Sequence, residues 1–162
     1  ALFLPKEAAH SSVYQVKPGD NLTAISRKNN VTIDLIKKIN GLQSDVLHPN
    51  MKLNIPSYKF SVVVDKSQNT LLLKGDEEVL KTYVVSTGEK NSTPIGDFKI
   101  TDKIANPTWY KAGAVAPFGS ADNVLGTRWL GFSKKGFGIH GTTEPEKLGQ
   151  QVTAGCVGMK ND

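Results

Sequence analysis

The chain has 162 residues and a mass of 17.5 kDa, enough for one medium domain or two small ones. Its 38% hydrophobic content, with 15 glycines and 8 prolines, excludes disorder and indicates a globular protein rich in strands and loops. A single cysteine excludes an internal disulfide framework, and no apolar run reaches the length of about 18 residues that spans a membrane. The net charge of +5 lies mostly in the N-terminal third, where a solvated lysine surface is favoured over an approach to an anionic polymer.

Residues 1–11 begin A-L-F-L-P, without an initiator methionine, and are too short for a complete signal peptide. We expect an N-terminal tail, the remainder of a leader that was removed or trimmed. Residues 14–17 alternate in polarity and predict a short strand. The turn that follows offers Asp20 or Asn21 as the N-cap of a helix.

Two short helices and a second strand are predicted next. The first helix begins near Leu22 and is broken at residues 29–30. The second covers 32–39, where isoleucines recur every three positions, and Gly41 ends it. Residues 52–55 then alternate in polarity and predict the second strand.

Three patterns in this part resemble a LysM domain: Y-x-V-x-x-G-D-x-L at 14–22, I-x-x-x-N-G at 36–41 and L-N-I-P at 53–56. The resemblance covers residues 12–56 and implies an α+β domain of βααβ order. It also implies binding of glycans that contain N-acetylglucosamine, such as peptidoglycan, although simple turn formation also explains the loop glycine and prolines. The loops that would form the glycan groove contain Gly19, Asp20, Asn21, Leu22, Leu47, His48, Pro49 and Asn50, the last standing where glycine is usual.

From Phe60 onward the pattern changes from helical stripes to strands, and tight turns join the first three into an antiparallel meander. Residues 105–128 have little periodicity and predict a long loop, which is usually functional or mobile in a compact domain. Strands are predicted over 60–64, 70–74, 79–86, 97–101, 128–132 and 137–140.

The one cysteine, Cys156, lies between Gly155 and Val157, sixteen positions after His140. A lone cysteine is more often a small buried hydrophobe than a catalyst. An imidazole that takes the thiol proton makes the sulfur nucleophilic, and flanking glycines let backbone N–H groups approach an oxyanion. The segment therefore indicates a cysteine nucleophile with a histidine base. Such a thiol is expected to alkylate well below its usual pKa of about 8.5.

This run resembles the signature of the L,D-transpeptidase catalytic domain, or YkuD domain. The matching residues are His140, Gly141, Thr153, Gly155, Cys156 and Val157. The resemblance implies a mainly-β sandwich over residues 57–162. Domains of the family usually continue with a helix and a final strand, so we expect a catalytic domain truncated at its C-terminal end.

The resemblance implies a cysteine acyltransferase of the bacterial cell envelope that cross-links peptidoglycan and is captured by carbapenems. Cys156 would attack the L–D peptide bond of a tetrapeptide stem, release D-alanine and pass the acyl group to an amine of another stem. His140 would be the base, the Gly141 carbonyl would orient its ring, and the N–H groups of Gly155 and Cys156 would form the oxyanion hole.

Two positions depart from the family signature, and both bear on substrate binding. Ala154 stands where histidine is frequent and Gly158 where arginine is frequent, so donor anchoring is in doubt. Arg128 is a possible replacement for the missing cation, and Trp109 is a candidate for the cleft wall. For Thr153, a substrate contact and a purely structural role in the turn are both open.

Several alternatives remain open on the sequence. Water in place of the acceptor amine would give an L,D-carboxypeptidase, and the departures at Ala154 and Gly158 allow an inactive peptidoglycan-binding protein. Nucleic-acid binding has only the mild positive charge behind it, without aromatic–basic interleaving. The three histidines and Cys156 lack metal-ligand spacing, and no cofactor is expected. The oligomeric state is left open.

Overall fold

The computed structural model describes residues 11–111 and 113–161 of the chain. The predicted N-terminal tail, with His10, therefore lies outside the described residues apart from Ser11. Within the described ranges, no helix combines the length and the apolar character needed to cross a membrane.

The chain divides into two compact units. The first runs up to Ser61 and includes Lys74–Lys81, and the second comprises Val62–Leu73 and the chain from Thr82 onward. Each unit has a hydrophobic core of its own.

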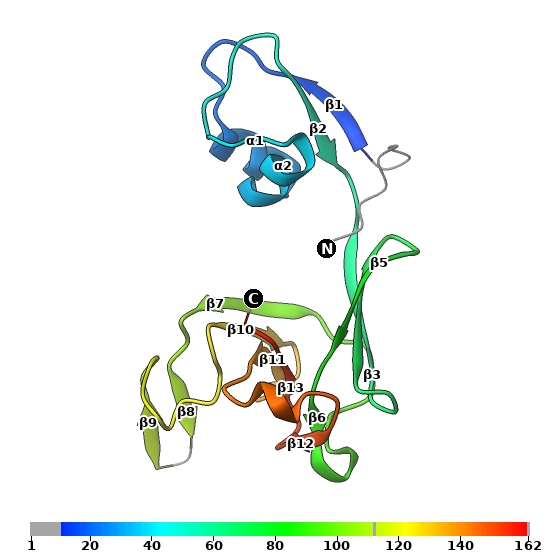
Figure 1. Cartoon of the computed structure of the whole chain (residues 1–162), viewed down its shortest axis with the longest axis vertical. Helices are drawn as coiled ribbons and strands as arrows, with labels where there is room; N and C mark the ends of the chain where they lie inside the picture. The colour runs from blue at the N-terminus through cyan, green and yellow to red at the C-terminus, as the bar shows by residue number, and fades with distance from the viewer. Residues whose placement is uncertain (1–10, 112, 162) are drawn as a thin grey trace. The chain divides into compact units, whose positions relative to one another are not determined.

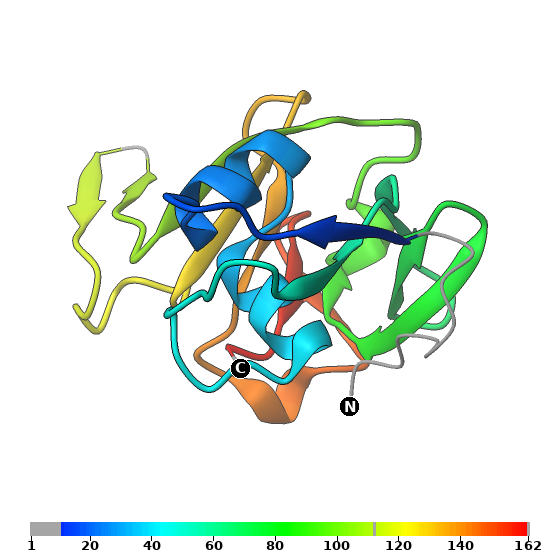
Figure 2. The same cartoon turned by 90° about the horizontal axis from the view of Figure 1, so that it is seen from above.

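In the first unit, β1 (Ser11–Gln15) pairs antiparallel with β2 (Lys52–Pro56), and α1 (Leu22–Asn29) and α2 (Ile33–Asn40) lie on one side of this pair (Figures 1 and 2). The strand–helix–helix–strand order confirms the predicted α+β fold of this segment. The first strand starts and ends earlier than the predicted range 14–17, because its residues from Ser11 onward already pair with β2.

Side-chain caps define where both helices begin. Asn21 Oδ1 accepts a hydrogen bond from the Ala24 N–H at 2.9 Å, and Thr32 Oγ1 accepts one from the Leu35 N–H at 3.2 Å. The second helix ends at Gly41, which adopts the left-handed conformation that the sequence predicted for a stop. The apolar faces of the helices and strands meet in a core made of Val16, Leu22, Ile25, Ile36, Leu53 and Ile55.

The remainder of the described chain is mainly β, as predicted. β3 (Phe60–Asp65), β4 (Thr70–Gly75) and β5 (Glu78–Val84) form a three-stranded sheet in chain order, which confirms the predicted meander. Two short strands, β6 (Thr87–Gly88) and β12 (Gln151–Thr153), pair in parallel and form a separate two-stranded sheet.

A four-stranded sheet carries the residues that the sequence singled out. Its order is β13 (Val157–Met159), β11 (Gly138–Gly141), β10 (Arg128–Phe132) and β7 (Ile100–Ala105). β11 runs parallel to β13 and antiparallel to β10, so β11 has a hydrogen-bonded neighbour on each side. Buried residues from this sheet and from the chain before it form the core of the second unit: Leu71, Val85, Ile139 and Val157.

Several element boundaries in the second unit differ from the predicted ones. The long loop predicted over 105–128 contains a hairpin of β8 (Trp109–Lys111) and β9 (Ala114–Ala116), which stands out from the sheet in both views (Figures 1 and 2). The strand predicted over 97–101 is β7 and starts only at Ile100. Strands of two or three residues, such as β12 and β13, are too short to show a period in the sequence. Two single-turn 3₁₀ helices, η1 (Glu89–Asn91) and η2 (Pro145–Lys147), complete the described elements.

Candidate active site

Two adjacent parallel strands bring the predicted base and nucleophile together. His140 lies on β11 opposite Gly158 of β13, and Cys156 immediately precedes β13. His140 is also paired with Trp129 of β10, whose indole stacks on the imidazole with ring centroids 6.1 Å apart and an interplanar angle of 17°. β11 therefore carries the imidazole, and the turn before the neighbouring strand β13 carries the thiol.

The ring of His140 is buried and has a defined hydrogen-bond partner. Its Nδ1 lies 2.6 Å from the carbonyl oxygen of Gly141. A carbonyl oxygen can only accept, so Nδ1 carries the proton and the Nε2 of the neutral ring is left as an acceptor. Burial lowers the pKa of His140, and the hydrogen bond to Gly141 partly opposes this effect. The ring is therefore neutral at neutral pH, as a general base must be.

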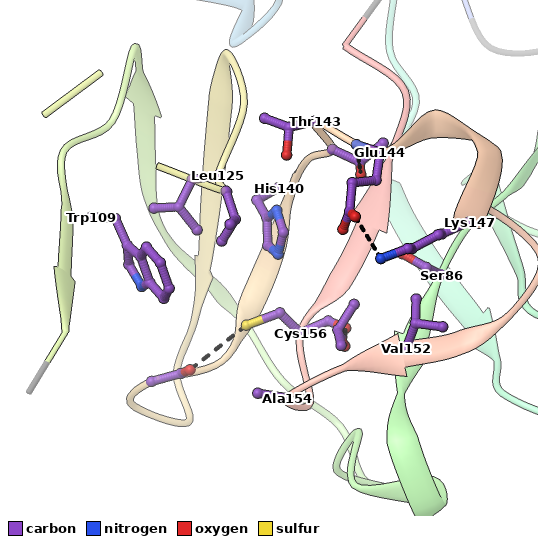
Figure 3. Close-up of a pocket in the computed structure, with 14 residues that line it drawn as sticks. Ser86, Trp109, Leu125, His140, Thr143, Glu144, Lys147, Val152, Ala154 and Cys156 are labelled. Carbon is purple, nitrogen blue, oxygen red and sulfur yellow. Dashed lines mark hydrogen bonds and ion pairs between the residues drawn. The ribbon is translucent and has the colours of Figure 1, made fainter. Parts of the chain in front are cut away.

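The thiol of Cys156 is half-buried and projects into the same pocket as the imidazole (Figure 3). Its Sγ lies 3.8 Å from the carbonyl oxygen of Gly136. Burial raises the pKa of Cys156, and a backbone hydrogen bond with Gly138 lowers it by a smaller amount. Desolvation therefore disfavours the thiolate in the resting protein, and alkylation well below the usual thiol pKa stays a prediction that depends on proton transfer to His140.

The turn before the nucleophile is held by its own side chain. Thr153 Oγ1 donates to the carbonyl oxygen of Cys156 at 2.6 Å and accepts from the N–H of Gly155 at 3.2 Å. Gly155 has φ of 130°, a region that residues with a side chain rarely adopt. The Gly155 N–H, predicted as an oxyanion donor, is therefore already engaged by Thr153 in the resting structure.

A pocket of about 380 Å³ surrounds the thiol and the imidazole (Figure 3). Of the predicted substrate-binding residues, Trp109, Thr153 and Ala154 line it, whereas Arg128 and Gly158 do not. Arg128 Nη1 instead donates to the carbonyl of Thr127 at 2.8 Å. The lining is completed by residues that the sequence did not single out: Ser86, Val124, Leu125, Gly136, Thr142, Thr143, Glu144, Lys147 and Val152.

Gly158 lies directly against Ser86, in the space that a side chain at position 158 would need. It is buried, and its backbone exchanges two hydrogen bonds with Ser86, at 2.8 and 2.9 Å. A Cβ at position 158 would collide with the Ser86 hydroxyl. Because Ser86 itself lines the pocket, a serine side chain occupies the place from which a side chain at 158 would emerge.

Opposite charges form part of the pocket wall. Lys147 Nζ lies 2.5 Å from Glu144 Oε1, and both side chains are about half exposed (Figure 3). The hydrogen bond and the charge of Glu144 raise the pKa of Lys147, which stays protonated. Both residues lie between His140 and Cys156 in the chain, in the spacer of the family signature. The charge of these two residues and their position within the signature could have identified them as pocket residues.

The described residues contain no group of three or more His, Cys, Asp or Glu side chains arranged to hold a metal ion. The reactive and charged groups that line the pocket are the thiol, the imidazole and the Glu144–Lys147 pair.

The predicted glycan loops meet at one end of the first unit. The Asn50 N–H donates to the Val16 carbonyl at 2.8 Å, so the second loop lies beside the start of the first. Asn50 has φ of 69°, the left-handed conformation expected where glycine is usual. Gly19, His48 and Pro49 are exposed, whereas Leu22 is buried in the core and could reach a glycan only through its backbone.

The polar side chains of the first loop have structural partners. Asp20 Oδ2 accepts from Tyr14 Oη at 2.7 Å and from the Lys17 N–H at 2.8 Å, and these hydrogen bonds lower the pKa of Asp20. Asn21 is the helix cap described above. Leu47 is half-buried against the core. The exposed surface of the loops is therefore formed mainly by Gly19, Asn21, His48, Pro49 and Asn50.

Two family models match the chain. The model for the L,D-transpeptidase catalytic domain (YkuD) matches residues 59–162, and the model for the LysM domain matches residues 14–56.

The curated relatives of this chain include candidate L,D-transpeptidases and a candidate peptidoglycan endopeptidase. The candidate L,D-transpeptidase YqjB of Bacillus subtilis is 42% identical over 62% of this chain, which spans 60% of that relative's length. The candidate L,D-transpeptidase YkuD of Bacillus licheniformis is 31% identical over 92% of this chain and 87% of its own length. The candidate peptidoglycan endopeptidase LytE of Bacillus subtilis is 43% identical over 27% of this chain, but only 13% of its own length.

Solved structures share the fold. An L,D-transpeptidase from Mycobacterium smegmatis has a TM-score of 0.53 at 19% identity, covering 68% of this chain and 54% of its own. The L,D-transpeptidase LdtMt1 in complex with imipenem has a TM-score of 0.52 at 22% identity, with the same two coverages. These likenesses confirm the predicted fold class of the β-rich domain.

Proposed function

This chain belongs to the family of L,D-transpeptidases with a YkuD catalytic domain, and from that membership we propose that it is a peptidoglycan L,D-transpeptidase with Cys156 as its nucleophile. One observation carries the proposal: His140 and Cys156 line the same pocket, and the Gly141 carbonyl leaves Nε2 of the imidazole free to accept a proton. This arrangement of nucleophile, base and orienting group is what acyl transfer requires.

In the proposed first step, Nε2 of His140 takes the thiol proton while Sγ of Cys156 attacks the carbonyl carbon of the L–D peptide bond. The C–N bond then breaks, the imidazolium gives its proton to the departing D-alanine amine, and a thioester remains. Burial lowers the pKa of His140 and raises that of Cys156, which supports a neutral pair whose proton moves as the sulfur attacks.

In the second step, the amine of another stem attacks the thioester carbon and loses a proton to His140. The C–S bond breaks, and the sulfur recovers the proton from the imidazolium. A new amide then joins two stems. Water in place of the amine would give hydrolysis, so the acceptor decides between transfer and carboxypeptidase activity.

The charged wall fits a substrate with charged ends. Lys147 supplies a cation on the pocket surface and replaces Arg128 as our candidate for holding a carboxylate of the stem, since Arg128 does not line the pocket. Glu144 balances this cation and could face the ammonium group of an acceptor.

We assign glycan binding to the exposed loops of the LysM domain. The match to the LysM model and the stretch shared with a candidate peptidoglycan endopeptidase support this assignment. A chain that holds the glycan with one domain and acts on its peptide with the other gains local substrate concentration. From this combination we propose that the protein acts in the bacterial cell envelope, outside the cytoplasm.

The direct test is intact-mass spectrometry of the protein after incubation with a disaccharide-tetrapeptide. We expect an acyl-enzyme whose added mass equals the substrate minus D-alanine, followed by cross-linked dimer. Free tripeptide alone would identify a carboxypeptidase. Unchanged substrate, with peptidoglycan binding retained, would replace the proposal with that of an inactive binding protein.

His48→Asp tests the glycan loops. The side chain is exposed, so the substitution should leave stability unchanged, while it introduces a negative charge facing the carboxylates of peptidoglycan. We expect binding to purified peptidoglycan sacculi to weaken about tenfold, corresponding to about 1.4 kcal/mol. Co-sedimentation with sacculi measures it.

The matched control for this variant is Gln43→Asp, which makes the same charge change at an exposed position of the same domain outside both loops. It should bind sacculi like the parent protein. Equal binding by His48→Asp and Gln43→Asp would remove His48 from the glycan site.

A further inference from the structure

Asn161 connects three segments at the edge of the active site. Its Oδ1 accepts from the Thr127 N–H at 2.9 Å and from the Thr127 hydroxyl at 3.2 Å. Its Nδ2 donates to the Thr142 carbonyl at 2.7 Å. One amide side chain thus joins the chain after β13 to the residue before β10 and to the residue after β11.

Both partners of Asn161 are adjacent to groups that hold His140. Thr142 follows Gly141, whose carbonyl accepts from Nδ1 of the imidazole, and Thr127 comes two residues before Trp129, which stacks on the ring. Asn161 therefore hydrogen-bonds to the two segments that carry these restraints.

The orientation of the Gly141 carbonyl follows from the hydrogen bonds on either side of it. That carbonyl shares a peptide plane with the Thr142 N–H, which donates to the Met159 carbonyl at 2.8 Å. The carbonyl and the N–H of a trans peptide point in opposite directions, so fixing the N–H toward β13 directs the carbonyl toward the imidazole. The bond from Asn161 to the Thr142 carbonyl fixes the next peptide as well.

The amide of Asn161, an exposed residue, lies close to two glycines. A Cβ at Gly141 would collide with Asn161 Oδ1, and so would a Cβ at Gly126. The amide thus occupies space that two glycines leave open.

We infer that Asn161 is a positioning residue for catalysis: it fixes the Gly141–Thr142 backbone so that His140 keeps its proton on Nδ1 and its acceptor nitrogen toward the thiol. The inference rests on the proposed role of His140 as the base. An imidazole with the opposite tautomer would present an N–H to the thiol and could not take its proton.

The test compares Asn161→Ala and Asn161→Asp in the full chain. The aspartate keeps an acceptor for Thr127 but loses the donor to Thr142, so it separates the two arms of the amide. For both variants we expect kcat to fall about tenfold to a hundredfold with KM nearly unchanged, as for a misplaced catalytic group. Nitrogen-15 NMR of the His140 ring should change from the Nδ1–H tautomer to a mixture of both tautomers.

Asn40→Ala is the matched control. Asn40 also makes three hydrogen bonds that tie two segments together, to the Ile36 carbonyl and to both backbone groups of Asn54, but it does so in the first unit. This variant should lose stability without changing the tautomer of His140 or kcat. Thermal unfolding checks that each variant is folded.

A folded Asn161→Asp protein with the parent's kcat or with an unchanged His140 tautomer would overturn the inference. The NMR measurement needs no substrate, so it distinguishes this failure from a failure of the proposed function, which would appear as parent protein that forms no acyl-enzyme.

Discussion

Cys156→Ala is expected to abolish acyl transfer, with a loss on the order of 10⁴-fold or more, because no second thiol exists in the chain to replace the nucleophile. The substitution removes one sulfur from a pocket wall and leaves the hydrogen bonds of Thr153 in the preceding turn, which go to backbone atoms. Stability should therefore change little. Intact-mass spectrometry should show no acyl-enzyme with the tetrapeptide and no adduct with imipenem.

The parent protein provides the comparison for both reagents. It should form an imipenem adduct that peptide mapping places on Cys156, because a strained acyl group suits the same nucleophile. Binding of the Cys156→Ala protein to sacculi should equal that of the parent, because glycan binding is assigned to the LysM domain. Cross-linked product from the folded variant, or an adduct on any other residue, would refute the mechanism.

His140→Asn should lower kcat about 10²- to 10⁴-fold, the range for loss of a general base. The asparagine amide can still donate to the Gly141 carbonyl, so the local backbone is retained, but it has no titrating nitrogen. In the parent, burial lowers the pKa of His140, so the basic ring persists to a lower pH than the ordinary histidine value of about 6.5. Activity of the parent should therefore fall only when pH drops through that lowered pKa, and the variant should lack this limb.

Alkylation by iodoacetamide gives a substrate-free measure of the same pair. Burial raises the pKa of Cys156 in the parent, so at neutral pH the sulfur becomes nucleophilic by giving its proton to His140. Without that base, the thiolate forms only by ionisation at alkaline pH. The variant's alkylation rate should rise steadily into alkaline pH, while the parent should react faster at neutral pH. Cys156→Ala is the blank for this assay. Identical pH profiles for parent and His140→Asn would separate the imidazole from the thiol and contradict the proposed pairing.

Local chemistry was what the sequence predicted well. His140, Gly141 and Cys156 lie in one short segment, so their chemistry could be read from spacing, and the α-helices could be read from isoleucine periodicity and caps. The hydrogen bond between His140 and Gly141 involves neighbouring residues and was expected from the resemblance alone.

Long-range packing was what the sequence could not predict. Ser86 enters the pocket because its backbone pairs with Gly158, a contact between residues 72 positions apart that no local pattern encodes. Arg128 was expected at the pocket on the strength of its charge, but charge alone does not say where a side chain points. Lys147 was overlooked for the opposite reason, since a lysine in a polar stretch is usually a solvated surface residue.

The two reacting groups sit on strands that differ in their support. His140 is on β11, between two hydrogen-bonded strands, whereas Cys156 is in the turn before β13, a strand that pairs with β11 on one side and with Ser86 on the other. Turns open locally at lower free-energy cost than strands that are hydrogen-bonded on both sides. The imidazole is thus held by the sheet, whereas the position of the sulfur depends on the turn that Thr153 ties together.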